Sequence, residues 1–183
     1  MSTPSSSYRH SHRLRCEPID KALHVVLVEP EIPPNTGNIA RLCAATACSL
    51  HLVHPLGFRV DEKAVRRAGL DYWHLVDVRQ HADWAAFSQS LEPAARLHFF
   101  TGKASRSFYD ALYQAGDYLV FGRESRGLPA QLLDQHQAQL VAIPTVGAVR
   151  SLNLANCVAL GVYEALRQTD ALSECQLVEL NSD

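Results

Sequence analysis

The sequence predicts an α/β fold, with a mostly parallel β-sheet and helices on both of its faces. Short β-branched or apolar runs alternate along the chain with segments of helical periodicity. This alternation is typical of strand–helix–strand units. The 183 residues suffice for one domain, and no internal repeat or linker divides the body of the chain.

Strands and helices alternate from residue 23 onward. The strands are expected at 23–28, 50–54, 74–78, 97–101, 118–122 and 140–143. The helices are expected at 36–47, 62–68, 82–91, 108–115, 129–137 and 152–168. Parallel sheets of this kind bind ligands at the carboxyl ends of their strands, where the strand order reverses. The loops that follow strands are therefore the candidate binding segments.

The two ends of the chain differ from its body in composition and charge. Residues 1–21 are rich in Ser, His and Arg, carry a net charge of +2 and lack apolar periodicity, which predicts a disordered basic tail. A solvated extension is favoured over a transit peptide, because no clear amphipathic pattern is present. Residues 169–183 form an acidic tail of charge −4, and the body at 22–168 is neutral. Any nucleic-acid surface must therefore come from local clusters of basic residues.

The cysteine and histidine patterns indicate neither a disulfide framework nor a metal site. The five cysteines are odd in number and include no CxxC pair, so reduced thiols in a cytoplasmic protein are the simplest interpretation. The nine histidines include no HExxH. No apolar run approaches the roughly 20 residues of a membrane span, so no membrane partner is expected.

The loop after the first strand, at 29–41, combines a rigid backbone with polar side chains. Two prolines fix the backbone, and Asn35 or Thr36 can cap the helix that follows. Arg41 then lies in the second turn of that helix. A capped helix with a surface arginine explains this segment equally well.

Two later loops contain glycines but no known phosphate-binding motif. The Gly-Lys pair at 102–103 lacks the first glycine and the following Ser or Thr of a P-loop, and the chain has no GxGxxG. In the segment at 121–129, Gly122 ends a strand and would let a ligand approach the backbone closely. Glu124 is the candidate acid, although a tight strand-to-helix connection explains this loop as well.

Four polar residues gather at the start of the long C-terminal helix: Arg150, Ser151, Asn153 and Asn156. Ser151 or Asn153 can cap the helix, but capping does not readily explain all four at the start of an otherwise apolar helix. Ser151 is not expected to be a nucleophile, because no GxSxG surrounds it and no Ser-His-Asp order is evident.

Basic and aromatic residues adjoin at 61–73. Lys63, Arg66 and Arg67 share one face of the predicted helix, and a tyrosine and a tryptophan follow. Phosphate contact combined with base stacking is one interpretation. A solvated helix whose aromatic neighbours pack in the core is the other, and this segment alone does not decide between them.

Together these segments resemble the SPOUT class of methyltransferases and, more narrowly, the TrmL (YibK) family, which methylates the ribose of the tRNA wobble nucleotide. The resemblance covers about residues 23–168. It is carried, in the family's order and spacing, by the runs PEIPPNTGNIARLCAAT, LGF, RRAGLDYW, FGRESRGLP and IPTVGAVRSLNLANCVALGVYEALRQ. It implies S-adenosylmethionine-dependent 2′-O-methylation of nucleotide 34, cytidine or uridine, in the tRNA anticodon loop.

The resemblance also implies features that periodicity cannot show. They are a deep trefoil knot in the C-terminal part and a homodimer with Arg41 facing the cofactor pocket across or beside the subunit interface. The cofactor positions carried over are Phe100, Thr101, Gly102, Gly122, Ile143, Ser151 and Leu152. The catalytic positions are Arg41, Glu124 and Asn153, with Asn35 shaping the site. The expected RNA-binding residues are Lys63, Arg66, Arg67, Arg123, Arg126 and Arg150.

The expected mechanism is an in-line displacement in which Arg41 contacts the ribose 2′-oxygen. The resemblance suggests that this arginine is the base, but a guanidinium stays protonated in proteins. We therefore expect Arg41 to stabilise the developing negative charge and orient the oxygen. A phosphate or Glu124 would accept the proton.

Two alternatives stay open at this point. One is a SPOUT ribose methyltransferase that acts on rRNA or on another tRNA nucleotide. The other is an RNA-binding or assembly protein that keeps the fold without catalysis, and binding of the cofactor would separate it from the enzymes.

Overall fold

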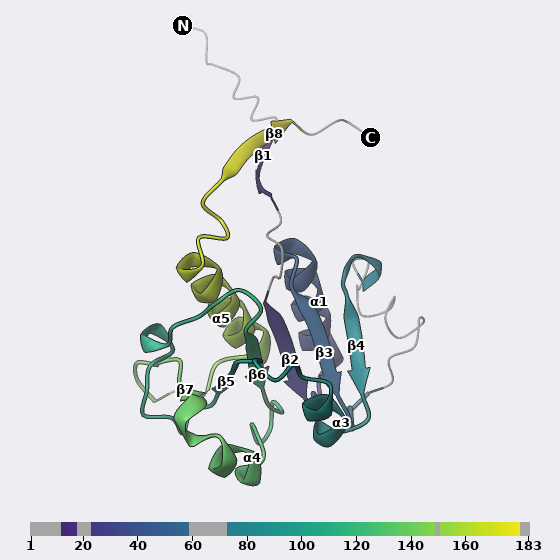
Figure 1. The fold of residues 1–183 in the computed structure, drawn as a ribbon, viewed down its shortest axis with the longest axis vertical. Coiled ribbons are helices and arrows are strands. Elements are labelled where there is room, and N and C mark those ends of the chain that lie inside the picture. The colour runs from purple at the N-terminus through teal and green to yellow at the C-terminus, as the bar shows by residue number, and fades with distance from the viewer. Residues whose placement is uncertain (1–11, 18–22, 59–72, 149–150, 180–183) are drawn as a thin grey trace, which may run out of the picture.

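A six-stranded sheet lies at the centre of the structure, a computed structural model that describes residues 12–17, 23–58, 73–148 and 151–179 (Figure 1). Its strands are β2 (His24–Val28), β3 (Ser49–Val53), β4 (Val78–His81), β5 (Leu97–Phe100), β6 (Tyr118–Phe121) and β7 (Leu140–Val141). All neighbouring strands are parallel, in the order β4-β3-β2-β6-β5-β7. The strand order reverses between β2 and β6, which is where such sheets bind ligands.

Helices cover both faces of this sheet, as the sequence predicts. They are α1 (Pro33–Thr46), α3 (Trp84–Gln89), α4 (Ala130–Gln135) and α5 (Leu154–Gln168), with 3-10 turns η1 (Trp73–Leu75), η2 (Phe108–Asp110) and η3 (Gln137–Gln139). Alternate residues of β2 divide between two apolar cores. Val25 and Leu27 belong to the core that contains α1 and α5, and Val26 belongs to the core that contains α3 and α4.

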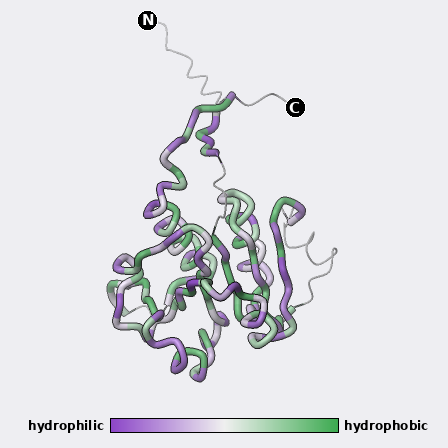
Figure 2. Tube along the Cα trace, in the orientation of Figure 1, coloured by the Kyte–Doolittle hydropathy of each residue, from purple (hydrophilic) through white to green (hydrophobic). Residues whose placement is uncertain are grey.

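Most predicted elements are confirmed to within a few residues, but the strand predicted at 74–78 is wrong. Residues Trp73–Leu75 form η1, and β4 begins only at Val78. The sequence of β4, VRQH, is mostly hydrophilic (purple in Figure 2) because β4 is an edge strand that leaves side chains to solvent. The prediction looked for an apolar run, so it placed the strand at 74–78, before the hydrophilic residues that form β4.

The helix predicted at 108–115 is also wrong, because only η2 forms there. The buried Tyr113 holds the chain in another path: its hydroxyl donates to the Phe108 carbonyl at 3.0 Å, and its N–H donates to Gln168 Oε1 at 3.1 Å. These bonds satisfy polar groups that a helix would otherwise pair. The helix predicted at 62–68 lies outside the described residues.

The start of α1 differs from the expected cap. The N-cap residue is Ile32, which makes no side-chain cap bond, and the two prolines occupy the first helical positions. Asn35 and Thr36, the expected caps, lie inside the helix and are buried. This shift frees the side chain of Asn35 for contacts with other loops.

The expected disordered tail is wrong for residues 12–16, which form strand β1 (His12–Cys16). It pairs antiparallel with β8 (Cys175–Glu179) near the other end of the chain, and the ribbon extends away from the sheet (Figure 1). A disulfide joins Cys16 to Cys175, which corrects the expectation of reduced thiols throughout. Composition is a local property, so it does not reveal pairing between segments 159 residues apart.

Three histidines form a hydrogen-bonded row across the sheet on its α3 face. His24 Nδ1 lies 3.1 Å from His51 Nε2, and His51 Nδ1 lies 3.0 Å from His81 Nε2. The ring of Phe87 packs edge-on against His51 and His81. Burial, followed by the neighbouring His24 and His81, lowers the pKa of His51 from 6.5 to about 3. Burial also lowers the pKa of His24 and of His81.

This row predicts a loss of stability in mild acid. Because the folded state holds His51 neutral, only the unfolded chain takes up a proton as the pH falls below 6.5. We expect the free energy of unfolding to fall by about 2 kcal/mol between pH 7 and pH 5 from His51 alone. Urea unfolding at both pH values measures this, and a His51→Gln variant should show a smaller difference. Equal unfolding midpoints for the parent at pH 7 and pH 5 would contradict the prediction.

Candidate active site

The loops singled out in the sequence meet at one edge of the sheet. Because the strands are parallel, the segments that follow β2, β5, β6 and β7 all leave from their carboxyl ends. Of these strands, β2 and β6 flank the point where the order reverses, and β5 and β7 continue next to β6. The predicted catalytic and cofactor residues that the structure describes therefore come from neighbouring strand ends, loops and helix starts.

Glu124, in the loop after β6, binds the start of α1. Its carboxylate accepts hydrogen bonds from Glu31 N at 2.8 Å, from Ile32 N at 3.3 Å and from Asn35 Nδ2 at 2.9 Å. The unpaired N–H groups at a helix N-terminus attract negative charge. Glu124 thus supplies from another loop the cap that the side chain of Ile32 does not provide.

Asn35 continues this contact to the start of α5. Asn153 Nδ2 donates to Asn35 Oδ1 at 3.0 Å, while Asn153 Oδ1 accepts from Ala155 N at 2.9 Å. The prediction that Asn153 can cap the last helix is confirmed. The side chains Glu124, Asn35 and Asn153 therefore form one chain of hydrogen bonds across three segments.

Arg41 lines a groove of about 560 Å³ between α1 and α5. It lies on α1, six positions after Asn35, and its side chain is exposed. The groove is lined by Asn35, Asn38, Arg41, Leu42 and Ala45 of α1 together with Asn153, Ala155, Asn156 and Ala159, which cap or belong to α5. The structure thus places Arg41 beside Asn35 and Asn153, and the groove can accept a polar group next to a guanidinium.

Gly122 is required by the shape of the loop after β6. A side-chain carbon at this buried position would lie 2.2 Å from the backbone of Gly127 and Leu128. The chain turns back so tightly there that Arg123 and Gly127 pair through both backbone N–H groups, at 3.2 and 2.9 Å. The expected close approach at Gly122 exists, but the partner is this loop itself.

Two glutamates that the sequence analysis did not single out hold this loop against the segment after β2. Glu29 forms an ion pair with Arg123, and Glu31 accepts from the N–H of Ser125 at 3.0 Å and from its hydroxyl at 2.9 Å. These hydrogen bonds from Ser125 lower the pKa of Glu31. Glu31 lies within the run that carries the resemblance and Glu29 directly precedes that run, and this position was the only signal in the sequence.

The expected cofactor residues come from three adjacent loops. Phe100 is buried and stacks on Phe121 with ring centroids 4.5 Å apart, and the N–H of Thr101 donates to Val141 O at 2.9 Å. A side-chain carbon at Gly102 would meet no atom within 4 Å, so this backbone is open. The remaining positions are the half-buried Ile143 and the exposed Ser151 and Leu152.

The expected RNA-binding residues are only partly described. Arg123 is engaged with Glu29, and Arg126 is exposed in the same loop. The other four, Lys63, Arg66, Arg67 and Arg150, lie outside the described residues. Within the described part of the chain, no group of three or more His, Cys, Asp or Glu could hold a metal ion. No helix in that part is long and apolar enough to cross a membrane.

The fold and the site define an α/β protein whose polar loops gather at the carboxyl ends of a parallel sheet, and comparison with known proteins identifies its family. The sequence pattern of the SpoU rRNA methylase family matches residues 22–163. The chain therefore belongs to this family, and the resemblance found in the five sequence runs is confirmed.

Similar proteins narrow the comparison further. A Yersinia pestis protein named tRNA (cytidine(34)-2′-O)-methyltransferase is 53% identical over 151 residues, which cover 80% of this chain and 93% of that protein. An Acidovorax protein of the same name is 49% identical over 152 residues, covering 82% and 94%. A solved structure described as "Structural insights into the 2-OH methylation of C/U34 on tRNA" superposes with a TM-score of 0.77 at 49% identity, covering 81% and 96%.

Proposed function

We propose that this protein transfers a methyl group from S-adenosylmethionine to the ribose 2′-hydroxyl of nucleotide 34, a cytidine or uridine, in the anticodon loop of tRNA. The observation that carries this proposal is the groove in which Arg41 lies beside the hydrogen-bonded chain Glu124–Asn35–Asn153. The names of the similar proteins, at about half identity over nearly their whole length, supply the substrate.

The cofactor would be held by the loops after β5, β6 and β7. Gly102 fits this role because nothing lies within 4 Å of its open side, and Ser151 and Leu152 are exposed at the start of α5. Phe100, Thr101, Gly122 and Ile143 would complete the site. When bound, S-adenosylmethionine supplies an electrophilic methyl group on sulfur. We also propose that the C-terminal part of the chain is threaded into the trefoil knot that the resemblance implies.

Arg41 would stabilise the 2′-oxygen as negative charge develops on it. A guanidinium remains protonated, so it donates hydrogen bonds rather than accepting the hydroxyl proton. Asn35 and Asn153 hold α1 and α5 together beside it, and Glu124 positions Asn35. All three hydrogen bonds to Glu124 go to its two carboxylate oxygens, which favours an RNA phosphate as the acceptor of the proton.

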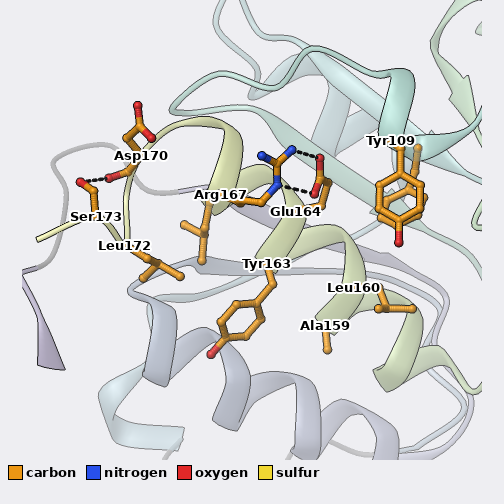
Figure 3. A pocket seen from close by; sticks show the side chains of 11 residues that line it. Tyr109, Ala159, Leu160, Tyr163, Glu164, Arg167, Asp170, Leu172 and Ser173 are labelled. Carbon is orange, nitrogen blue, oxygen red and sulfur yellow. Dashed lines mark hydrogen bonds and ion pairs between the residues drawn. The ribbon is translucent and has the colours of Figure 1, made fainter. Parts of the chain in front are cut away.

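A second copy of the chain would cover α5. Leu160 and Tyr163 are large exposed apolar side chains on this helix, and with Leu172 they line a groove of about 700 Å³ (Figure 3). Ala159 lines both this groove and the one that contains Arg41. A homodimer built on this face would therefore bring the partner subunit close to Arg41.

The expected basic residues would extend the surface that binds RNA phosphates. They are Lys63, Arg66, Arg67, Arg126 and Arg150. Arg123 would join them only after its ion pair with Glu29 opens.

The test is methylation of total tRNA from a strain that lacks its own wobble ribose methylase. Purified protein is mixed with labelled S-adenosylmethionine and the tRNA, and the methylated nucleoside is mapped by mass spectrometry. A 2′-O-methyl group at nucleotide 34 is the expected result. A mark at another nucleotide, or on added rRNA, would keep the chemistry and replace the substrate. Absence of cofactor binding would overturn the proposed enzyme.

Asn153 has two separable tasks, and two variants distinguish them. Asn153→Ala should lower the free energy of unfolding by about 1 kcal/mol, because the cap of α5 is lost. Asn153→Ser should retain the cap and most of the stability, but not the bond to Asn35. Urea unfolding and single-turnover methylation measure the two effects. We expect both variants to lose about tenfold in rate; full activity in Asn153→Ser would show that the bond to Asn35 does not matter.

A further inference from the structure

The ribbon of β1 and β8 joins the two ends of the chain through one covalent bond. Cys16 lies directly opposite Cys175 in the antiparallel register, with Cα atoms 4.0 Å apart, and their sulfurs form a disulfide. Both cysteines lie outside residues 22–163, the part of the chain that matches the family.

This ribbon has little other support. Leu14 and Leu177 are paired across the two strands on the same face as the disulfide, yet they are 67% and 71% exposed. Figure 1 shows the ribbon extending beyond the sheet and helices. A two-stranded ribbon without a buried apolar face is marginal in water. Its pairing therefore depends strongly on the bond between Cys16 and Cys175.

The disulfide lies against the wall of the α5 groove. Cys175 Sγ is 3.1 Å from the carbonyl oxygen of Leu172, and Cys16 Sγ is 4.0 Å from the same oxygen. Leu172 and Ser173 line one end of the groove, just beyond the C-terminus of α5 (Figure 3). The segment that forms this wall is thus fixed at one side by α5 and at the other by the disulfide.

The three remaining cysteines are poor competitors for thiol chemistry. Cys43 and Cys48 are buried, and burial raises the pKa of both thiols. Burial likewise raises the pKa of the half-buried Cys157. The thiolate is the reactive form, so a raised pKa disfavours exchange at these positions. Cys16 and Cys175 are therefore the cysteines that we expect to undergo reversible oxidation.

We propose that Cys16 and Cys175 form a redox-sensitive clasp that holds Leu172 in the wall of the α5 groove and thereby strengthens contact with a second copy of the chain. The effect on the dimer rests on the proposed function, which places the partner on this face; the clasp itself does not. In the oxidised state the two ends of the chain are joined. In the reduced state the ribbon opens and the wall at Leu172 loses its anchor.

Closure requires an oxidant, for which a low-molecular-weight disulfide suffices. One cysteine thiolate attacks the reagent, forms a mixed disulfide and releases one thiolate of the reagent. The second cysteine thiolate attacks the mixed disulfide, forms the Cys16–Cys175 bond and releases the other thiolate. The two protons from the cysteines pass through solvent to the released thiolates, and two electrons reduce the reagent.

The test compares the full chain in oxidised glutathione and in reduced glutathione. Peptide mapping without reduction should find Cys16 joined to Cys175 in the oxidised sample. Sedimentation should then give a dimer dissociation constant that rises by about tenfold to a hundredfold on reduction, as expected for one leucine side chain losing its apolar contact. Cys16→Ser and Cys175→Ser should match the reduced protein under both conditions. Cys157→Ser is the matched control and should behave as the parent.

The variant Leu172→Ser tests the apolar contact of Leu172 while leaving the disulfide in place. It should weaken the dimer in oxidised glutathione and remove the dependence of the dimer dissociation constant on reduction. Absence of the intramolecular bond in oxidised glutathione overturns the clasp. A bond that forms without changing the dimer constant overturns the effect on the groove. The methylation assay on nucleotide 34 reports on the proposed function separately, so either failure is recognisable by itself.

Discussion

Replacing Arg41 with alanine is expected to lower kcat by about 10² to 10³, the loss that follows removal of one donor to a developing oxyanion. Affinity for S-adenosylmethionine should stay within about threefold, because the predicted cofactor loops leave from β5, β6 and β7 and not from α1. Single-turnover methylation of tRNA and calorimetric titration of the cofactor measure the two quantities.

Two further arginine variants make this result specific. Arg41→Lys keeps a positive charge but loses the planar fork of donors, so its rate should lie between those of the parent and of Arg41→Ala. Arg79→Ala is the control, since Arg79 lies on the edge strand β4, is paired with Asp77 just before that strand, and should be silent in catalysis. If Arg41→Ala lost cofactor binding instead of turnover, Arg41 would belong to the cofactor site.

Gly122→Ala is expected to disrupt the loop after β6 and, with it, cofactor binding. The added carbon would meet the backbone of Gly127 and Leu128 at 2.2 Å, and backbone atoms cannot move aside as a flexible side chain can. We expect the free energy of unfolding to fall by about 3 kcal/mol, at the upper end of the cost of overpacking. Displacement of this loop should also release Glu124 from the start of α1 and lower activity.

The matched control is Gly102→Ala, in the predicted cofactor loop after β5. A side-chain carbon at Gly102 meets no atom within 4 Å, so the variant should be as stable as the parent in urea. Any loss of cofactor affinity in Gly102→Ala would then reflect contact with the cofactor itself. Equal stability of Gly122→Ala and Gly102→Ala would show that the loop at 122–127 opens without cost.

The histidine row and the polar chain of the site illustrate where prediction from the sequence stops. The strands that contain His24 and His51 follow from their apolar pattern, but nothing local indicates that these side chains bond to each other and to His81. The register of parallel strands decides this. Likewise, the sequence suggested Glu124 as a catalytic acid. In the structure its carboxylate accepts three hydrogen bonds from the segment after β2, and these position the start of α1.

The class of fold, the placement of most strands and helices, and the loops that contain the polar residues could all be predicted from the amino-acid sequence. Periodicity and turn chemistry are local, and the resemblance added the family and its expected residues. Three contacts follow only from tertiary packing: Glu124 caps the start of α1 at Ile32, Asn35 links Glu124 to Asn153, and Cys16 meets Cys175. These contacts join segments that are about 90 to 160 positions apart, so they depend on how the whole chain packs and not on any stretch of it.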